Sequence, residues 1–133
     1  MYGDEEGWVL CSGHYNIVHK NHVELFKYAS TLGPVVVGIN CDEVNTKKNG
    51  SRAVPAADRA YVLNSIRYVR EVVIFTEPNP SELILHLRPR YLVKGPDYRD
   101  KYLPEEAACL IAGTQILFRP GTYQYSSKVL TAP

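Results

Sequence analysis

The sequence predicts an α/β fold: a doubly wound, five-stranded parallel sheet in a single domain covering residues 1–133. Five apolar runs, each too short for a helix, alternate along the chain with segments of helical period. The apolar runs are continuous, which is typical of parallel strands covered on both faces. With 133 residues, 45% of them hydrophobic and 22% charged, the chain has the size and composition of one globular domain.

The first three elements form a strand, a helix and a second strand. The run GWVLCS at residues 7–12 is the first expected strand. Apolar residues recur at helical spacing over residues 22–33, which predicts a helix. The β-branched run PVVVGIN at residues 34–40 is the second strand.

The middle of the chain begins with an irregular stretch. Residues 41–55 show no sustained period and contain Asn49-Gly50, a turn signal, so we expect them to form the longest loop. Apolar spacing predicts a helix over residues 56–68, and EVVIFT at residues 71–76 is the third strand.

The last elements repeat the alternation. We expect a short helix over residues 80–87 and a fourth strand at residues 90–95. The segment 104–113 opens with proline in its first turn and closes on glycine, which favours a helix. TQILFR at residues 114–119 is the fifth strand, and SSKVL at residues 126–130 begins a last helix.

Charge and composition restrict the partners. A net charge of +1 argues against broad electrostatic binding of nucleic acid or anionic lipid, so an anion site should be local. We expect no membrane association, because no apolar run approaches the roughly 20 residues of a membrane span. The acidic start GDEE lacks the layout of a signal peptide, and the cysteines show no paired spacing, which together favour a cytoplasmic protein with reduced thiols.

A ligand site is expected where the strands end. In a doubly wound sheet, ligands bind beyond the carboxyl ends of the strands, where the strand order reverses. Four segments follow strand ends and could share that edge: residues 12–22, 40–55, 94–98 and 119–127.

The first of these segments, SGHYNIVHKNH, holds three of the four histidines of the chain. His19 and His22 are three residues apart at an expected helix start, so their side chains share one face beside unpaired backbone N–H groups. Such a pair could stabilise a phosphate whose charge grows in a transition state. A pair that only caps the helix fits the spacing equally well, whereas a zinc site lacks a third ligand at usual spacing.

The same segment resembles the signature G-x-F-D-x-x-H-x-G-H of the cytidylyltransferase-like nucleotidyltransferases. The resemblance implies a Rossmann-like fold and a site in which His19 and His22 bind the nucleoside triphosphate and stabilise its α-phosphate. It further implies nucleotide contacts from the residues that precede the histidines and acceptor contacts from two of them. The implied nucleotide-binding residues are Ser12, Gly13, His14 and Tyr15, and the implied acceptor-binding residues are His14 and Asn16.

Two positions depart from the signature. Asn16 stands where the family usually has aspartate, and Asn21 stands where it has glycine. Asparagine tolerates the left-handed backbone region, so a turn at residue 21 could persist. These departures also allow a different class of protein, one that binds nucleotides but has lost catalysis.

The segment NTKKNGSRAVPAADR resembles the lysine- and arginine-bearing segment that precedes the second helix of the family. The resemblance places Lys47 or Lys48 over the triphosphate as a catalytic group and turns Arg59 toward the ligand. Phosphoryl transfer depends on positioning and charge neutralisation, which mobile ammonium groups can supply. A solvated basic loop is the alternative.

Two later segments carry further resemblances. YLVKGPDY at residues 91–98 resembles the corresponding segment of the nucleotidyltransferase domain of bacterial ADP-heptose synthases. YSSKVL resembles the family's closing motif, in a final helix that we expect to be short and that a partner subunit could complete. The resemblances imply nucleotide contacts from Lys94, Gly95, Asp97, Arg119, Ser126 and Ser127.

Taken together, the resemblances imply a nucleotidyltransferase that joins a nucleoside monophosphate from ATP or CTP to a small phosphorylated sugar or polyol and releases pyrophosphate. The fourth-strand segment favours heptose 1-phosphate. The stretch RYVREV at residues 67–72 resembles glycerol-3-phosphate cytidylyltransferases, which allows glycerol 3-phosphate and implies a homodimer. The chemistry implies Mg²⁺, but the sequence identifies no ligands for it.

Overall fold

Five parallel strands form one sheet in the order β3-β2-β1-β4-β5. The structure is a computed structural model, and it describes residues 7–121. All five expected strands are present with slightly trimmed ends, which confirms the predicted doubly wound fold. The strands are β1 (Val9–Gly13), β2 (Val35–Asn40), β3 (Glu71–Phe75), β4 (Tyr91–Lys94) and β5 (Gln115–Phe118).

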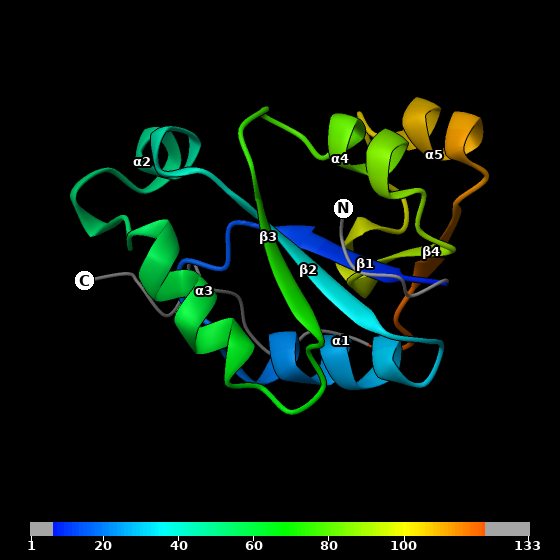
Figure 1. The fold of residues 1–133 in the computed structure, drawn as a ribbon, viewed down its shortest axis with the longest axis horizontal. Helices are drawn as coiled ribbons and strands as arrows, with labels where there is room; N and C mark the ends of the chain where they lie inside the picture. The colour runs from blue at the N-terminus through cyan, green and yellow to red at the C-terminus, as the bar shows by residue number, and fades with distance from the viewer. Residues whose placement is uncertain (1–6, 122–133) are drawn as a thin grey trace.

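The helices cover both faces of the sheet (Figure 1). On one face lie α1 (Lys20–Ser30) and α3 (Ala56–Asn64), and on the other lie α4 (Ser81–Leu87) and α5 (Glu106–Ala112). The strand β1 shows why its sequence is apolar throughout. Its side chains alternate between the two layers, so Val9 and Cys11 pack in one core cluster and Leu10 packs in the other.

The expectation of a long loop at residues 41–55 is wrong. The segment forms the helix α2 (Asp42–Asn49) and the 3₁₀ turn η1 (Gly50–Arg52). The helix has no apolar stripe, because its only buried residue is the polar Asn45. A search for apolar period therefore does not detect it.

Other details also differ from expectation. The first helix begins at Lys20, two residues early, and the helix expected to reach residue 68 ends at Asn64. The short 3₁₀ turn η2 (Pro96–Tyr98) follows β4. The expected last helix, at residues 126–130, lies outside the described residues.

The strand order reverses beside β1. The chain passes from β1 through α1 to β2 on one side, whereas β4 pairs with the other side of β1. The segments that follow β1 and β4 therefore leave the sheet next to each other, at the position where doubly wound sheets bind ligands. Among residues 7–121, no helix has the length and apolarity that crossing a membrane would require.

Candidate functional site

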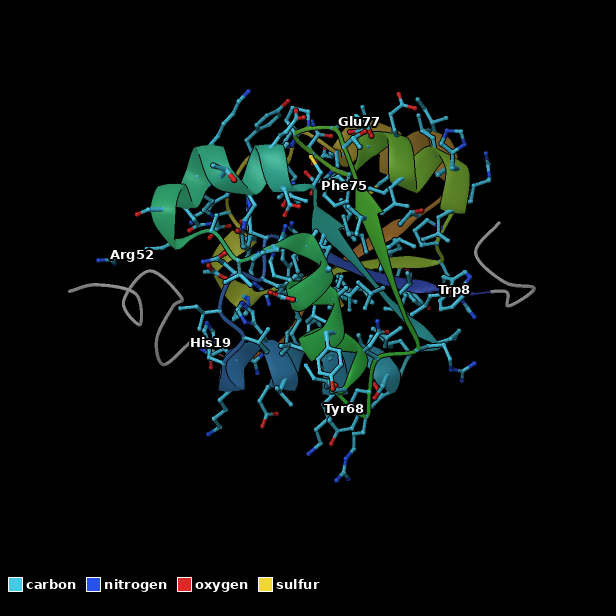
Figure 2. All side chains as sticks on the ribbon, turned by 60° about the vertical axis from the view of Figure 1, so that its left-hand side comes forward. Trp8, His19, Arg52, Tyr68, Phe75 and Glu77 are labelled. Carbon is cyan, nitrogen blue, oxygen red and sulfur yellow. The ribbon has the colours of Figure 1, made fainter. Side chains whose placement is uncertain are left out.

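A cavity of about 660 Å³ opens at the carboxyl ends of β1 and β4. Figure 2 shows His19 and Arg52 on this side of the molecule, opposite Trp8, which precedes β1. Most of the predicted site residues line the cavity, together with residues that the sequence did not indicate. The lining residues are Ser12, Gly13, His14, Tyr15, Asn16, His19, His22, Leu25, Lys48, Asn49, Arg52, Val93, Lys94, Gly95, Asp97 and Tyr98.

His19 and His22 cap the start of α1. The Nδ1 atom of His19 accepts a hydrogen bond from the backbone N–H of Asn21 at 3.2 Å, and Nδ1 of His22 accepts from the backbone N–H of His19 at 3.3 Å. The two imidazole rings stack, with centroids 3.9 Å apart and planes 20° apart. Capping and ligand binding, which the sequence left as alternatives, are therefore compatible in one pair of rings.

These hydrogen bonds determine the tautomer of both rings. A backbone N–H can only donate, so each Nδ1 must be unprotonated, and the proton of the neutral ring is on Nε2. Burial lowers the pKa of His22 to about 3, with the adjacent His19 adding to the effect, and burial also lowers the pKa of His19. Near neutral pH, both rings are therefore uncharged donors through Nε2.

Tyr15 packs against this histidine pair. Its ring meets the His22 ring edge-on at 5.0 Å between centroids and lies 5.4 Å from the Phe26 ring. The Tyr15 backbone is left-handed, with φ of 49°. A Cβ atom at Gly13 would lie 3.2 Å from the Tyr15 ring, so glycine leaves room for this arrangement.

The left-handed turn expected at Asn21 does not form. Asn21 lies in the first turn of α1, has 3% of its surface exposed, and is not among the non-glycine residues with positive φ. In this chain, the left-handed position of the segment is Tyr15. Asparagine in place of glycine is thus accommodated by regular helical backbone.

Asn45 connects α2 to the segment after β1. This side chain has no exposed surface, and its Nδ2 donates to Asn16 Oδ1 at 3.0 Å and to the Val54 carbonyl at 3.3 Å. Asn16 Oδ1 also accepts from the Val54 N–H, and Asn16 Nδ2 donates to the Arg52 carbonyl. The predicted acceptor-binding residue Asn16 lines the cavity, but its amide bonds to the protein.

Arg59 does not face the cavity, contrary to expectation. It is 1% exposed, and its guanidinium donates to the Val54 carbonyl at 2.7 Å, to the His14 carbonyl at 3.0 Å and to Asp42 Oδ1 at 3.5 Å. A buried guanidinium requires such acceptors, and here they come from three segments. Arg59 therefore fixes the positions of the segments that border the cavity.

The structure separates the two lysines of α2. Lys48 lines the cavity, whereas Lys47 is not among the lining residues. Asn49 and Arg52, which follow Lys48 closely in the chain, also line the cavity and were missed from the sequence. For Asn49, the available sequence signal is its spacing of four residues from Asn45, to which it is joined by a 2.8 Å hydrogen bond.

The segment after β4 forms another wall. Lys94 Nζ lies 3.3 Å from Glu105 Oε2 and 4.6 Å from the centroid of the Tyr98 ring, and its side chain is only 11% exposed. Burial is the main cause that raises the pKa of the Tyr98 phenol, so this ring remains neutral. Gly95 and Asp97 line the cavity beside them.

The remaining predicted residues lie away from the cavity or beyond the described chain. Arg119 is not among the lining residues; its backbone N–H donates to the Lys94 carbonyl at 2.9 Å. Ser126 and Ser127 lie outside residues 7–121. Within those residues, no group of three or more histidine, cysteine or acidic side chains is placed to hold a metal ion.

A doubly wound sheet with a cavity at its switch point, lined in part by histidine, asparagine and basic residues, is the architecture of an α/β nucleotide-binding domain. The chain belongs to the cytidylyltransferase-like family, whose model matches residues 10–118. This match confirms the nucleotidyltransferase class that the motif at residues 12–22 predicts.

Relatives of the chain include several proteins named bifunctional protein HldE. The identity is 44% over 96 residues with the protein of Nitratiruptor sp., which covers 70% of this chain and 21% of that protein. With the Campylobacter jejuni strain RM1221 protein it is 40% over 114 residues, or 84% and 23% of the two chains. With the Streptomyces coelicolor protein it is 38% over 132 residues, or 96% and 28%. The chain thus spans between about a fifth and somewhat over a quarter of these relatives.

Solved structures share the fold. A lipopolysaccharide core biosynthesis protein from Thermoplasma volcanium matches with a TM-score of 0.69 and 20% identity, covering 88% of this chain and 98% of that chain. A pantothenate synthetase from Thermus thermophilus matches with a TM-score of 0.66 and 13% identity, covering 96% and 62%. At these identities, the likeness concerns the fold alone.

The low pKa of His22 predicts a pH-dependent stability. An unfolded histidine titrates near 6.5 and the folded one at about 3, so below pH 6.5 the unfolded state binds more protons and stability falls as the pH falls. Between pH 7.5 and 5, the wild type should lose about 2 kcal/mol more unfolding free energy than His22→Asn, which retains a cap acceptor but does not titrate. Urea denaturation at both pH values measures this difference, and equal losses in the two proteins would contradict the assignment.

Proposed function

We propose that this chain transfers a nucleoside monophosphate from ATP or CTP to a small phosphorylated sugar or polyol and releases pyrophosphate. The observation that carries the proposal is the stacked His19–His22 pair, with both rings neutral and protonated on Nε2, at a helix start that lines the cavity. Membership of the cytidylyltransferase-like family supports it.

In the proposed reaction, an oxygen of the acceptor's phosphate attacks the α-phosphorus in line. The bond between that phosphorus and the bridging oxygen of the leaving pyrophosphate breaks. The attacking phosphate is already an anion, so no histidine needs to act as a general base. The Nε2–H groups of His19 and His22 donate to the α-phosphate oxygens, whose charge grows in the transition state. Lys48, on α2, adds a positive charge to the lining of the cavity.

Two acceptors remain candidates. Heptose 1-phosphate with ATP is favoured by the segment at residues 91–98. The 38–44% identity with HldE proteins supports the same acceptor. Glycerol 3-phosphate with CTP is the alternative, because of the stretch at residues 67–72. Turnover with each acceptor and each nucleotide distinguishes the two.

We propose that Mg²⁺ enters the site with the triphosphate. Magnesium usually keeps several waters and binds through substrate phosphates with one or two carboxylates. Among the described lining residues, Asp97 is the one carboxylate that could complete such a set. The ion would neutralise the charge of the phosphates during transfer.

We also propose that the chain forms a homodimer through the edge of the sheet at β3. Large apolar side chains are exposed on this edge strand and on the helix α3 that contacts it: Ile74 of β3 at 51%, and Tyr61 and Val62 of α3 at 77% and 49%. Sedimentation velocity should give a dimer for the wild type and a monomer for Tyr61→Glu, because a charge would oppose burial. Leu110→Glu, at a 79% exposed position of α5, is the matched control and should remain dimeric. A monomeric wild type would refute the proposal.

Replacing either histidine by asparagine tests the reaction directly. Asparagine can accept the capping hydrogen bond but has no group at the position of Nε2. His19→Asn and His22→Asn should therefore stay folded and each reduce pyrophosphate release by about 10²-fold or more, the scale of losing a transition-state donor. The matched control is His86→Asn on α4, whose side chain is 75% exposed and which should not change the rate.

Pyrophosphate release with Mg²⁺, each nucleotide and each acceptor, alongside nucleotide binding by calorimetry, gives the decisive comparison. Binding without turnover of any pair would identify a nucleotide-binding protein that lacks catalysis. Folded histidine variants with wild-type rates would show that the pair has only a capping role.

The two lysines of α2 provide an internal comparison. Lys48→Ala should slow turnover roughly 10-fold or more, because it removes a charge beside the phosphates, whereas Lys47→Ala should change it less than about twofold. Steady-state rates at several salt concentrations check this, since a screened charge loses effect. Equal, negligible effects of the two variants on the rate would mean that neither lysine reaches the phosphates.

A further inference from the structure

His14 lies in a hydrogen-bond network in which backbone groups determine which side-chain atoms donate and which accept. The Val54 carbonyl can only accept, so the Asn45 atom that faces it must be the amide nitrogen. The Val54 N–H can only donate, so the Asn16 atom that faces it must be the oxygen, and this oxygen also accepts from Asn45. Both asparagine side chains are thereby oriented without reference to any histidine.

The orientation of Asn45 determines the tautomer of His14. Asn45 Oδ1 lies 3.2 Å from His14 Nδ1 and also accepts from Asn49 Nδ2 at 2.8 Å. Because an oxygen that can only accept faces Nδ1, the His14 proton must be on Nδ1. In a neutral ring, Nε2 then carries a lone pair. His14 is thus the opposite tautomer to His19 and His22, although all three line one cavity.

The surroundings keep His14 neutral. Burial is the main cause that lowers its pKa, and the positive charges of Lys48 and Arg59 lower it further, while the Asn45 hydrogen bond opposes them. The same positive charges disfavour a metal cation at Nε2, and no cluster of metal-binding side chains exists among residues 7–121. A phosphate oxygen would meet this lone pair with another, so phosphate is disfavoured there as well.

We propose that His14 Nε2 accepts a hydrogen bond from a hydroxyl group of the substrate. This inference rests on the proposed function and divides the cavity chemically: His19 and His22 present donors to phosphate, and His14 presents an acceptor to a hydroxyl. The hydroxyl could belong to the ribose of the nucleotide or to the sugar or polyol acceptor. Either source supplies the required O–H donor.

The tautomers can be measured without any substrate. Two-dimensional ¹H–¹⁵N NMR of the histidine rings should show the proton on Nδ1 in His14 and on Nε2 in His19 and His22. His86, exposed on α4, serves as the reference for a ring in fast exchange. An Asn45→Leu variant should remove the Nδ1 preference of His14 and leave His19 and His22 unchanged. A His14 ring protonated on Nε2 in the wild type would overturn the inference.

Analogues that lack one hydroxyl identify the group that His14 recognises. His14→Leu should weaken the apparent affinity for the hydroxyl-bearing ligand about three- to tenfold, the value of one hydrogen bond, and should not change it for the matching deoxy analogue. His14→Gln, whose side-chain oxygen can reach a similar position, should restore part of the loss. Kinetics with ATP against 2′-deoxy-ATP and 3′-deoxy-ATP test the ribose. For the acceptor, heptose 1-phosphate is compared with a deoxyheptose 1-phosphate, and glycerol 3-phosphate with 1,2-propanediol 1-phosphate.

The two proposals fail in different ways. If the wild type releases no pyrophosphate, the proposed reaction fails, and nucleotide affinities from calorimetry still test the ribose arm. If the wild type turns over but His14→Leu weakens hydroxyl-bearing and deoxy ligands equally in both arms, the role of His14 is refuted and the proposed reaction stands.

Discussion

The buried amide of Asn45 is the interaction on which the cavity depends. A polar side chain without solvent contact is costly to bury unless its donors and acceptors are satisfied. Asn45 is satisfied by Asn16 and His14 after β1, by the Val54 carbonyl before α3, and by Asn49 one turn further along α2. Arg59 joins the same segments through hydrogen bonds to the Val54 and His14 carbonyls. The position of α2, and with it Lys48, thus follows from polar contacts in place of an apolar stripe.

At the start of α1, the hydrogen bonds that cap the helix also determine the tautomer of His19 and His22. A helix start leaves backbone N–H groups without partners, and here two imidazole nitrogens accept them. Because each Nδ1 accepts one of these hydrogen bonds, the proton of each ring is on Nε2. Burial lowers the pKa of both histidines, so the positive charge that a histidine would otherwise gain near pH 6.5 does not form there. The rings are therefore prepared as neutral donors before any ligand arrives, so little reorganisation is needed during the reaction.

The sequence predicted the sheet well because β1 and β2 are continuous apolar runs that only a doubly covered sheet accommodates. It missed α2, since the helix buries only Asn45 and has no period to detect. The resemblance to the family's basic segment turned Arg59 toward the ligand, whereas carbonyls of Val54 and His14 bury it. The burial of a polar side chain such as Asn45 or Arg59 depends on hydrogen-bond partners from distant segments, and a single sequence does not show which segments meet.

The three thiols of the chain differ in burial, and the partly exposed one lies at the start of α2, where it can be labelled. Cys11 and Cys109 are buried, and burial raises their pKa values to about 12 and about 11, so both stay protonated and unreactive near neutral pH. Cys41 is partly exposed and directly precedes α2 as its N-cap residue. A maleimide fluorophore should therefore attach selectively to Cys41 at the start of this helix. Its fluorescence would report how the part of the cavity lining that bears Lys48 responds when the cavity is filled.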